Sequence, residues 1–127
     1  MAHILVAEDE RDIRELINFT LVFAGHQVTQ AANGAEAVEL APKVKPDLIM
    51  MDVRMPKMTG YDVAERLRKR DRLTPILLIT GKEDDVLVTP HAHHAGINDV
   101  LFKPIDPPAL LAKVRELTAG RAAHGTG

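Results

Sequence analysis

The chain has 127 residues, no cysteine and a formal net charge of -2, from 16 basic and 18 acidic side chains. This length suits one domain with its own core, and the missing cysteines exclude a disulfide framework. The balanced charge gives no general attraction to nucleic acid or to an anionic membrane, and no apolar run suits a signal peptide or a membrane span, so we expect a cytoplasmic domain that binds neither directly.

Five short apolar stretches have the length and composition of strands. They cover residues 3–7, 26–30, 48–52, 75–80 and 99–102. The second stretch is more polar than the others, which favours the edge of a sheet. The third is an apolar run of four residues that ends in Asp52, which indicates a fully buried strand.

The spacing of apolar residues predicts a helix after each strand. The first helix carries apolar residues up to position 24, and Gly25 stands where a C-terminal cap belongs. Asn33 is a good N-cap for the second helix. Because Pro42 lacks the N–H that the helical ladder needs, we expect the second helix to end or kink near residue 41.

The third predicted helix begins near residue 60, and its C-terminal end is crowded with basic residues. These are Arg66, Arg68, Lys69, Arg70 and Arg72. We interpret them as a solvated face whose cations favour the negative end of the helix dipole. A docking patch for an acidic partner is the alternative interpretation.

The last third of the chain is less regular. A proline after a threonine predicts a short helix over 90–95, preceded by a loop over 82–88. Asp106 predicts the N-cap of the final helix. We expect one domain over 1–119, and a flexible C-terminal tail or truncated linker over 120–127, where helical periodicity is lost.

Alternating strands and helices predict an α/β fold, with a doubly wound parallel sheet of five strands and helices on both faces. The carboxyl ends of parallel strands meet at one edge, where such folds bind ligands. Three carboxylates, a hydroxyl and an ammonium end or follow the strands at this edge. They belong to Glu8, Asp9, Asp52, Thr80 and Lys103.

These groups point to phosphoryl chemistry. Carboxylates brought together repel one another, so their coexistence as anions calls for a cation, and Mg²⁺ accepts both carboxylate and phosphate oxygens. An ionised aspartate is a nucleophile toward phosphorus that needs no separate base. We expect Asp52 to take this role, with Lys103 neutralising the transferred group and the Thr80 hydroxyl bonding to it.

The pattern resembles a known family over about residues 2 to 118: the receiver domain of two-component response regulators, the CheY-like family. The resemblance rests on Glu8-Asp9, on Asp52-x-x-Met55-Pro56-x-Met58-x-Gly60, on Thr80 and on Lys103-Pro104. It implies a flavodoxin-like (βα)5 fold with the strand order 2-1-3-4-5.

The resemblance also implies a reaction. Asp52 would accept a phosphoryl group from the phosphohistidine of a sensor histidine kinase or a phosphotransfer protein. Lys103 would pair with that group, Thr80 would move to contact it, and the Lys103-Pro104 peptide would be cis. Such a domain is a signalling switch rather than an enzyme, with at most slow autodephosphorylation.

A metal site is implied as well. Asp9, Asp52 and the backbone carbonyl of Arg54 would bind Mg²⁺ or Mn²⁺, and Glu8 would help through water. The side chains of Arg54 and Lys82 stand beside the reaction centre in the sequence. We expect these two cations to modulate the lifetime of the phosphorylated state.

The region expected to switch departs from the family pattern. Val100 stands where many receivers carry an aromatic residue that turns inward on phosphorylation. Strand alternation puts Phe102 on the same face as Val100. We expect the output to depend on rearrangement of the loop and the helix over 90–95, with Phe102 contributing.

Several alternatives stay open. The residues also suit an Asp-nucleophile phosphatase or phosphotransferase, although Arg54 occupies the place of the second acid in such enzymes, or a degenerate receiver that only binds proteins. The domain is either stand-alone, with a downstream protein partner, or the N-terminal receiver of a longer regulator whose effector domain is missing. Phosphorylation-dependent dimerisation through the helix over 90–95, the strand over 99–102 and the final helix is open too.

Overall fold

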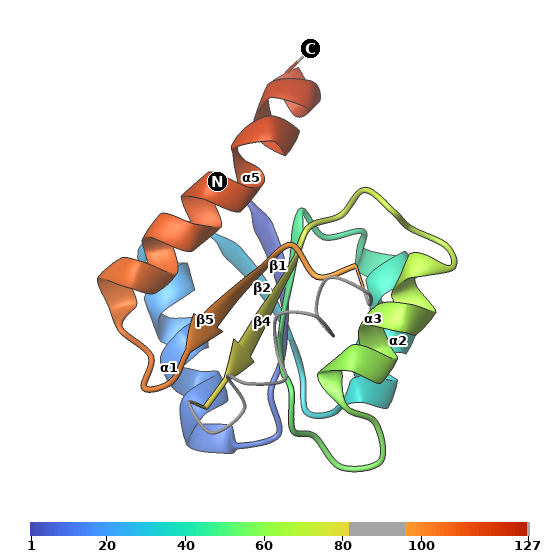
Figure 1. Ribbon diagram of the computed structural model, residues 1–127. Helices are drawn as coiled ribbons and strands as arrows, with labels where there is room; N and C mark the ends of the chain where they lie inside the picture. The colour runs from blue at the N-terminus through green and yellow to red at the C-terminus, as the bar shows by residue number, and fades with distance from the viewer. Residues whose placement is uncertain (82–95, 127) are drawn as a thin grey trace.

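The computed structural model describes residues 1–81 and 96–126, with side chains up to residue 119. Five strands form one parallel sheet in the order β2-β1-β3-β4-β5, which confirms the expected flavodoxin-like order (Figure 1). The elements are β1 (His3–Ala7), α1 (Arg11–Phe23), β2 (Gln27–Ala31), α2 (Gly34–Val44), β3 (Leu48–Asp52), α3 (Gly60–Arg68), β4 (Ile76–Thr80), β5 (Asp99–Phe102) and α5 (Pro107–Thr126). The predicted helix over 90–95, its loop and Lys82 lie outside the described residues.

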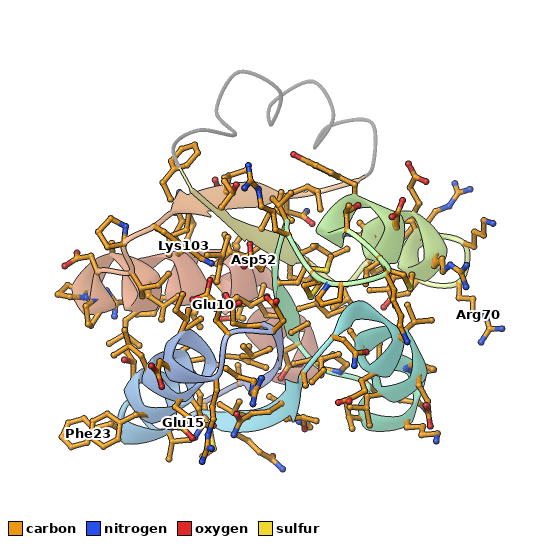
Figure 2. All side chains as sticks on the ribbon, turned by 90° about the horizontal axis from the view of Figure 1, so that it is seen from below. Glu10, Glu15, Phe23, Asp52, Arg70 and Lys103 are labelled. Atoms are coloured by element: carbon orange, nitrogen blue, oxygen red, sulfur yellow. The ribbon has the colours of Figure 1, made fainter. Side chains whose placement is uncertain are left out.

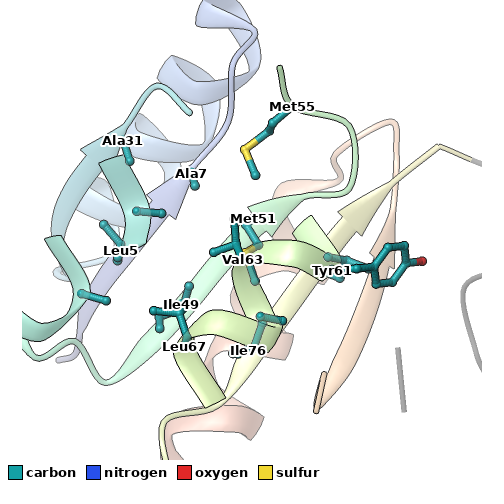
Figure 3. Close-up of a cluster of buried hydrophobic side chains, with 14 of the residues drawn as sticks. Leu5, Ala7, Ala31, Ile49, Met51, Met55, Tyr61, Val63, Leu67 and Ile76 are labelled. Carbon is teal, nitrogen blue, oxygen red and sulfur yellow. The ribbon is translucent and has the colours of Figure 1, made fainter. Parts of the chain in front are cut away.

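Two hydrophobic cores lie on opposite faces of the sheet. Helices α2 and α3 cover one face, and α1 and α5 cover the other (Figures 1 and 2). Successive side chains of a strand point to opposite faces, so each central strand supplies both cores. In β3, Ile49 and Met51 pack under α2 and α3 (Figure 3), whereas Leu48 and Met50 pack under α1 and α5. Burial on both faces explains the continuous apolar run.

Strand β2 lies at the edge of the sheet, as its polar composition predicts. It begins one residue later than expected, at Gln27, because the His26 N–H bonds to the Leu21 carbonyl at the end of α1. Gly25, with a φ of 95°, makes the turn between the two elements. A left-handed residue at this position suits glycine.

Helix α2 begins as predicted and ends later. Asn33 Oδ1 accepts the N–H of Glu36 at 2.9 Å, so Asn33 is the N-cap. Of the end or kink that Pro42 predicts near residue 41, the end is wrong, because the helix continues through Pro42 to Val44. Pro42 lies in the last turn, where the proline ring costs one bond of the ladder but keeps a helical φ. Lys45, in the left-handed conformation, then ends the helix.

Helix α5 extends past the predicted end of the domain. Asp106 Oδ2 accepts the Ala109 N–H at 3.2 Å, which confirms Asp106 as the N-cap. Residues 120–126 are helical where the sequence predicts a flexible tail or linker, and this end of α5 projects beyond the sheet (Figure 1). Alanines at 119, 122 and 123 favour a helix even without periodicity. None of the described helices is long and apolar enough to cross a membrane.

Candidate functional site

The five predicted site residues all lie at the carboxyl edge of the sheet. Asp52 and Thr80 are the last residues of β3 and β4, while Glu8-Asp9 and Lys103 directly follow β1 and β5. These four strands are consecutive neighbours in the sheet. Figure 2 shows Asp52 and Lys103 close together near the middle of this edge.

Lys103 holds two buried carboxylates. Its Nζ lies 2.7 Å from Asp52 Oδ2 and 3.2 Å from Glu8 Oε1. Glu8 is fully buried and Asp52 is 5% exposed. Burial alone would lower the pKa of Lys103, but the hydrogen bond and charge of Asp52, together with the charge of Glu8, outweigh it and raise that pKa. Lys103 is therefore a firmly protonated cation between two buried carboxyl groups.

The backbone fixes where this cation stands. The Lys103 N–H donates to the Thr80 carbonyl at 2.8 Å, which continues the β4–β5 pairing past Phe102. The Lys103-Pro104 peptide is cis, as the resemblance implies. Directly after Asp52 at the end of β3, the Val53 N–H donates to the carbonyl of Ile79 in β4 at 3.0 Å. Asp52 and Lys103 are thus both anchored by strand pairing.

Glu8 has a larger part in the site than the sequence indicates. Its N–H donates to the Ala31 carbonyl at 3.1 Å, so Glu8 continues the pairing of β1 with β2 and its side chain is buried. Oε2 accepts the Glu10 N–H at 3.0 Å. Oε1 has the Lys103 ammonium as an ion-pair partner, without the geometry of a hydrogen bond. Arg14, which the sequence did not single out, donates to the Glu8 carbonyl at 2.8 Å.

Burial raises the pKa of Glu8 to about 7. The Asp52 charge also raises this pKa, whereas the Glu10 N–H and the Lys103 charge lower it. Glu8 is therefore half protonated near neutral pH in the metal-free chain.

We expect this carboxyl to make the stability of the metal-free chain depend on pH. A pKa raised from 4.5 to about 7 means that the folded chain binds the Glu8 proton more tightly than the unfolded chain does. The stability gained from this proton is therefore complete below pH 4.5 and is lost as the pH rises through 7. From about pH 5 to about pH 8.5, the free energy of unfolding of the wild-type chain should fall by roughly 1 to 3 kcal/mol relative to that of Glu8→Gln. Urea unfolding of both chains in a chelating buffer measures this difference. Parallel pH profiles would contradict the raised pKa.

Three carboxylates are close enough to share a cation. One oxygen each from Glu8, Asp9 and Asp52 lies within 4.8 Å of the other two. Glu8 and Asp52 are buried, while Asp9 is exposed and opens the group to solvent. Carboxylate oxygens are the ligands that Mg²⁺ prefers, and a group of three carboxylates carries more negative charge than the single Lys103 ammonium can balance. The donor set therefore fits a magnesium-like ion.

The remaining predicted residues surround this centre. The Arg54 N–H lies 3.3 Å from Asp52 Oδ1, and Arg54 itself is exposed. Thr80 is fully buried, and its hydroxyl donates to the Gly81 carbonyl at 3.4 Å. Val100 packs against the core under α2 and α3, whereas Phe102 is 40% exposed.

The family model of the response regulator receiver domain matches residues 4–115. Among curated relatives, the DNA-binding dual master transcriptional regulator RpaA of Synechocystis sp. is 37% identical over 92% of this chain and 49% of its own length. The alkaline phosphatase synthesis transcriptional regulatory protein PhoP of Bacillus subtilis is 37% identical over 90% of this chain and 47% of its own length. The chain thus spans about half the length of these relatives.

Solved structures of similar size match as well. The chemotaxis response regulator CheY4 of Vibrio cholerae is 34% identical with a TM-score of 0.85, over 92% of this chain and 98% of its own. A putative response regulator from Chloroflexus aurantiacus is 32% identical with a TM-score of 0.87, over 93% of this chain and 98% of its own.

Proposed function

The chain belongs to the family of response regulator receiver domains of two-component systems, and we propose that Asp52 is its phosphoryl acceptor. The Asp52 carboxylate attacks the phosphorus of a phosphohistidine on a histidine kinase or phosphotransfer protein. A bond forms between an Asp52 oxygen and phosphorus while the bond from phosphorus to the imidazole nitrogen breaks. The imidazole leaves with the electron pair and takes up a proton from solvent.

The contact of Lys103 with Asp52 is the observation that carries this proposal. At 2.7 Å from Asp52 Oδ2, the ammonium places positive charge where the phosphoryl oxygens would gather. An aspartate that is already ionised needs no base to become a nucleophile. The buried Thr80 hydroxyl, at the end of the adjacent strand, would bond to a phosphoryl oxygen.

The metal site completes the proposal. Asp9, Asp52 and the Arg54 carbonyl would hold Mg²⁺ or Mn²⁺. Glu8 would contact the ion through water or, because it is buried, would instead position Lys103 through their ion pair. When bound, the cation neutralises the carboxylates and the oxygens of the transferring group. The expected effect of Arg54 and Lys82 on the lifetime of the phosphorylated state stays a prediction.

The output of the switch is also a proposal. Val100 and Phe102, on the strand beside Thr80, would respond to phosphorylation together with the segment over 90–95. Cytoplasmic location and a phosphorylation-dependent dimer stay predictions. The chain covers about half the length of the transcriptional regulators and nearly all of CheY4. A receiver of a longer regulator and a stand-alone domain that acts on a downstream protein both stay predictions.

Stoichiometry separates a receiver from a phosphatase. The exposed, basic Arg54 stands two residues after Asp52, where an Asp-nucleophile phosphatase needs a second acid, so we expect no turnover. With phosphoramidate and Mg²⁺, the chain should take up one phosphoryl group per molecule and lose it slowly. Phosphate release from p-nitrophenyl phosphate is the parallel assay. Many turnovers per chain in that assay would establish an enzyme instead.

A further inference from the structure

A groove of about 770 Å³ lies between the C-terminal ends of α2 and α3. Ile49 near the start of β3 and Thr74 just before β4 line it, so it lies at the amino end of these strands. Asp52 and Thr80 end the same two strands at the opposite edge. The groove is therefore separate from the proposed phosphorylation site.

The floor of the groove is apolar. Val38 and Ala41 from α2, Leu67 from α3 and Ile49 from β3 line it. Leu73, on the loop after α3, also lines it and is 83% exposed. An exposed leucine beside an apolar concavity is a typical anchor point for the apolar side chains of a ligand.

The rim of the groove is basic. Lys45 follows α2, and Arg66, Lys69 and Arg70 lie at the end of α3 and just after it. All four residues are exposed, and none of them forms an ion pair with another residue that the structure describes. In Figure 2, Arg70 extends from the outer side of the molecule, well away from Asp52. Four cations thus face solvent around one apolar floor.

Within the part of the chain that the structure describes, the groove has a single carboxylate against its four cations. Asp71 is the one acidic residue among the described lining residues. Its carboxylate accepts the N–H groups of Leu73 and Thr74 at 2.9 and 3.0 Å, and also the Thr74 hydroxyl. Burial would raise the pKa of Asp71, but these hydrogen bonds lower it below its usual value. The carboxylate is thus already held within its own loop.

The basic cluster at the end of α3 therefore has three parts. Arg68 is structural, because its guanidinium donates to the carbonyls of Gly96 and Asp71 and to Asn98 Oδ1. This contact corrects the expectation that the whole cluster is a solvated face. Arg66, Lys69 and Arg70 line the groove, whereas the exposed Arg72 does not.

We propose that this groove binds an acidic amphipathic segment of a partner protein. Apolar side chains of the segment occupy the floor beside Leu73, and its Asp and Glu side chains pair with the four rim cations. Nucleic acid fits less well, because no aromatic side chain is among the described lining residues to stack on a base, and the apolar floor would stay empty. This binding is independent of phosphorylation at Asp52.

Selection from a random peptide library on the whole unphosphorylated chain tests this proposal. The selected peptides should combine Asp and Glu with large apolar residues. Their affinity, measured by fluorescence anisotropy, should fall about tenfold or more in Arg66→Glu/Arg70→Glu, and several-fold in Leu73→Ser. The control is Arg72→Glu, which makes the same Arg-to-Glu charge reversal at an exposed site outside the groove. Its affinity for the peptides should stay within about twofold of wild type. All these side chains are exposed, so circular dichroism should show folded variants.

Other outcomes would overturn the proposal. Selection of no peptide, of peptides without acidic residues, or of peptides that bind the groove variants as tightly as wild type would exclude this occupant. A fluorescent single-stranded oligonucleotide that binds at Arg66 and Arg70 when no peptide does would assign the groove to nucleic acid. Oligomers in sedimentation that are lost in Arg66→Glu/Arg70→Glu would assign it to a second copy of the chain.

Discussion

Replacing Lys103 with methionine is expected to lower the free energy of unfolding by about 3 kcal/mol near pH 8, because it leaves two buried carboxylates without their cation. Lys103 Nζ contacts both Asp52 and Glu8, and its side chain is only 20% exposed. The loss should be smaller near pH 5.5, where Glu8 can take up a proton and become neutral. Phosphorylation by a small phosphodonor should slow by about a hundredfold or more, because the ammonium no longer faces the transferring group.

Lys113 provides a matched control for Lys103. Its Nζ lies 2.6 Å from Asp99 Oδ2, but the two side chains are 31% and 27% exposed. A partly exposed pair is screened by water, so Lys113→Met should cost less than about 1 kcal/mol and leave phosphorylation unchanged. Urea unfolding and the rate of phosphoryl uptake give both comparisons. Equal losses in the two variants would show that Lys103 is an ordinary surface cation.

Gly60→Ala is expected to destabilise the chain by about 2 kcal/mol and to impair phosphorylation. A Cβ at this position would lie 2.5 Å from the backbone oxygen of Asp52 and 2.9 Å from Leu78 Cδ1. The Gly60 N–H also donates to the Val53 carbonyl at 2.8 Å. Relief of the clash must therefore move the end of β3, which carries the acceptor carboxylate.

Gly25→Ala is the control that distinguishes the steric clash at Gly60 from the loss of a glycine as such. No atom lies within 4 Å of a Cβ built at Gly25, and its cost comes from a φ of 95°. We expect this variant to lose about 1 kcal/mol of stability and to accept phosphoryl groups at the wild-type rate. A Gly60→Ala chain that keeps both its urea midpoint and its phosphorylation rate would show that the end of β3 tolerates displacement.

The strands could be predicted from composition because the central strands are buried on both faces. β3 and β4 are apolar up to their last residues, Asp52 and Thr80, and every residue in them is buried. Their order in the sheet came only from the family resemblance, because strand order depends on contacts between distant segments. The end of α2 is not predictable from Pro42 alone, because the proline ring keeps a helical φ and the helix continues to Val44 despite the lost N–H.

The residues of the site could be predicted, but not their electrostatics. Glu8 and Asp9 are adjacent in the sequence, yet Glu8 is fully buried and Asp9 is exposed. This difference arises because β1 keeps its pairing with Ala31 through the Glu8 N–H. The contact of Lys103 with Glu8 joins the ends of β5 and β1, which are not neighbours in the sheet. No pattern within either segment of the sequence therefore indicates it.

The basic cluster shows the same limit. A charge run after a helix predicts exposure, which holds for Arg66 and Arg70. Arg68 instead bonds to Gly96 and Asn98, 28 and 30 residues further along the chain. The groove beside the cluster forms only when α2, α3 and the start of β3 are packed together. Periodicity therefore locates the cations without indicating the apolar floor between them.

Intact mass spectrometry after treatment with phosphoramidate and Mg²⁺ tests the role of Asp52 most directly. The wild-type chain should gain the mass of one phosphoryl group, and the Asp52→Ala chain should gain none. Omission of Mg²⁺ should slow the uptake by wild type, because the carboxylates of Glu8, Asp9 and Asp52 then lack their cation. An adduct of the same mass and yield on Asp52→Ala, or none on wild type, would contradict the assignment of Asp52 as the phosphoryl acceptor.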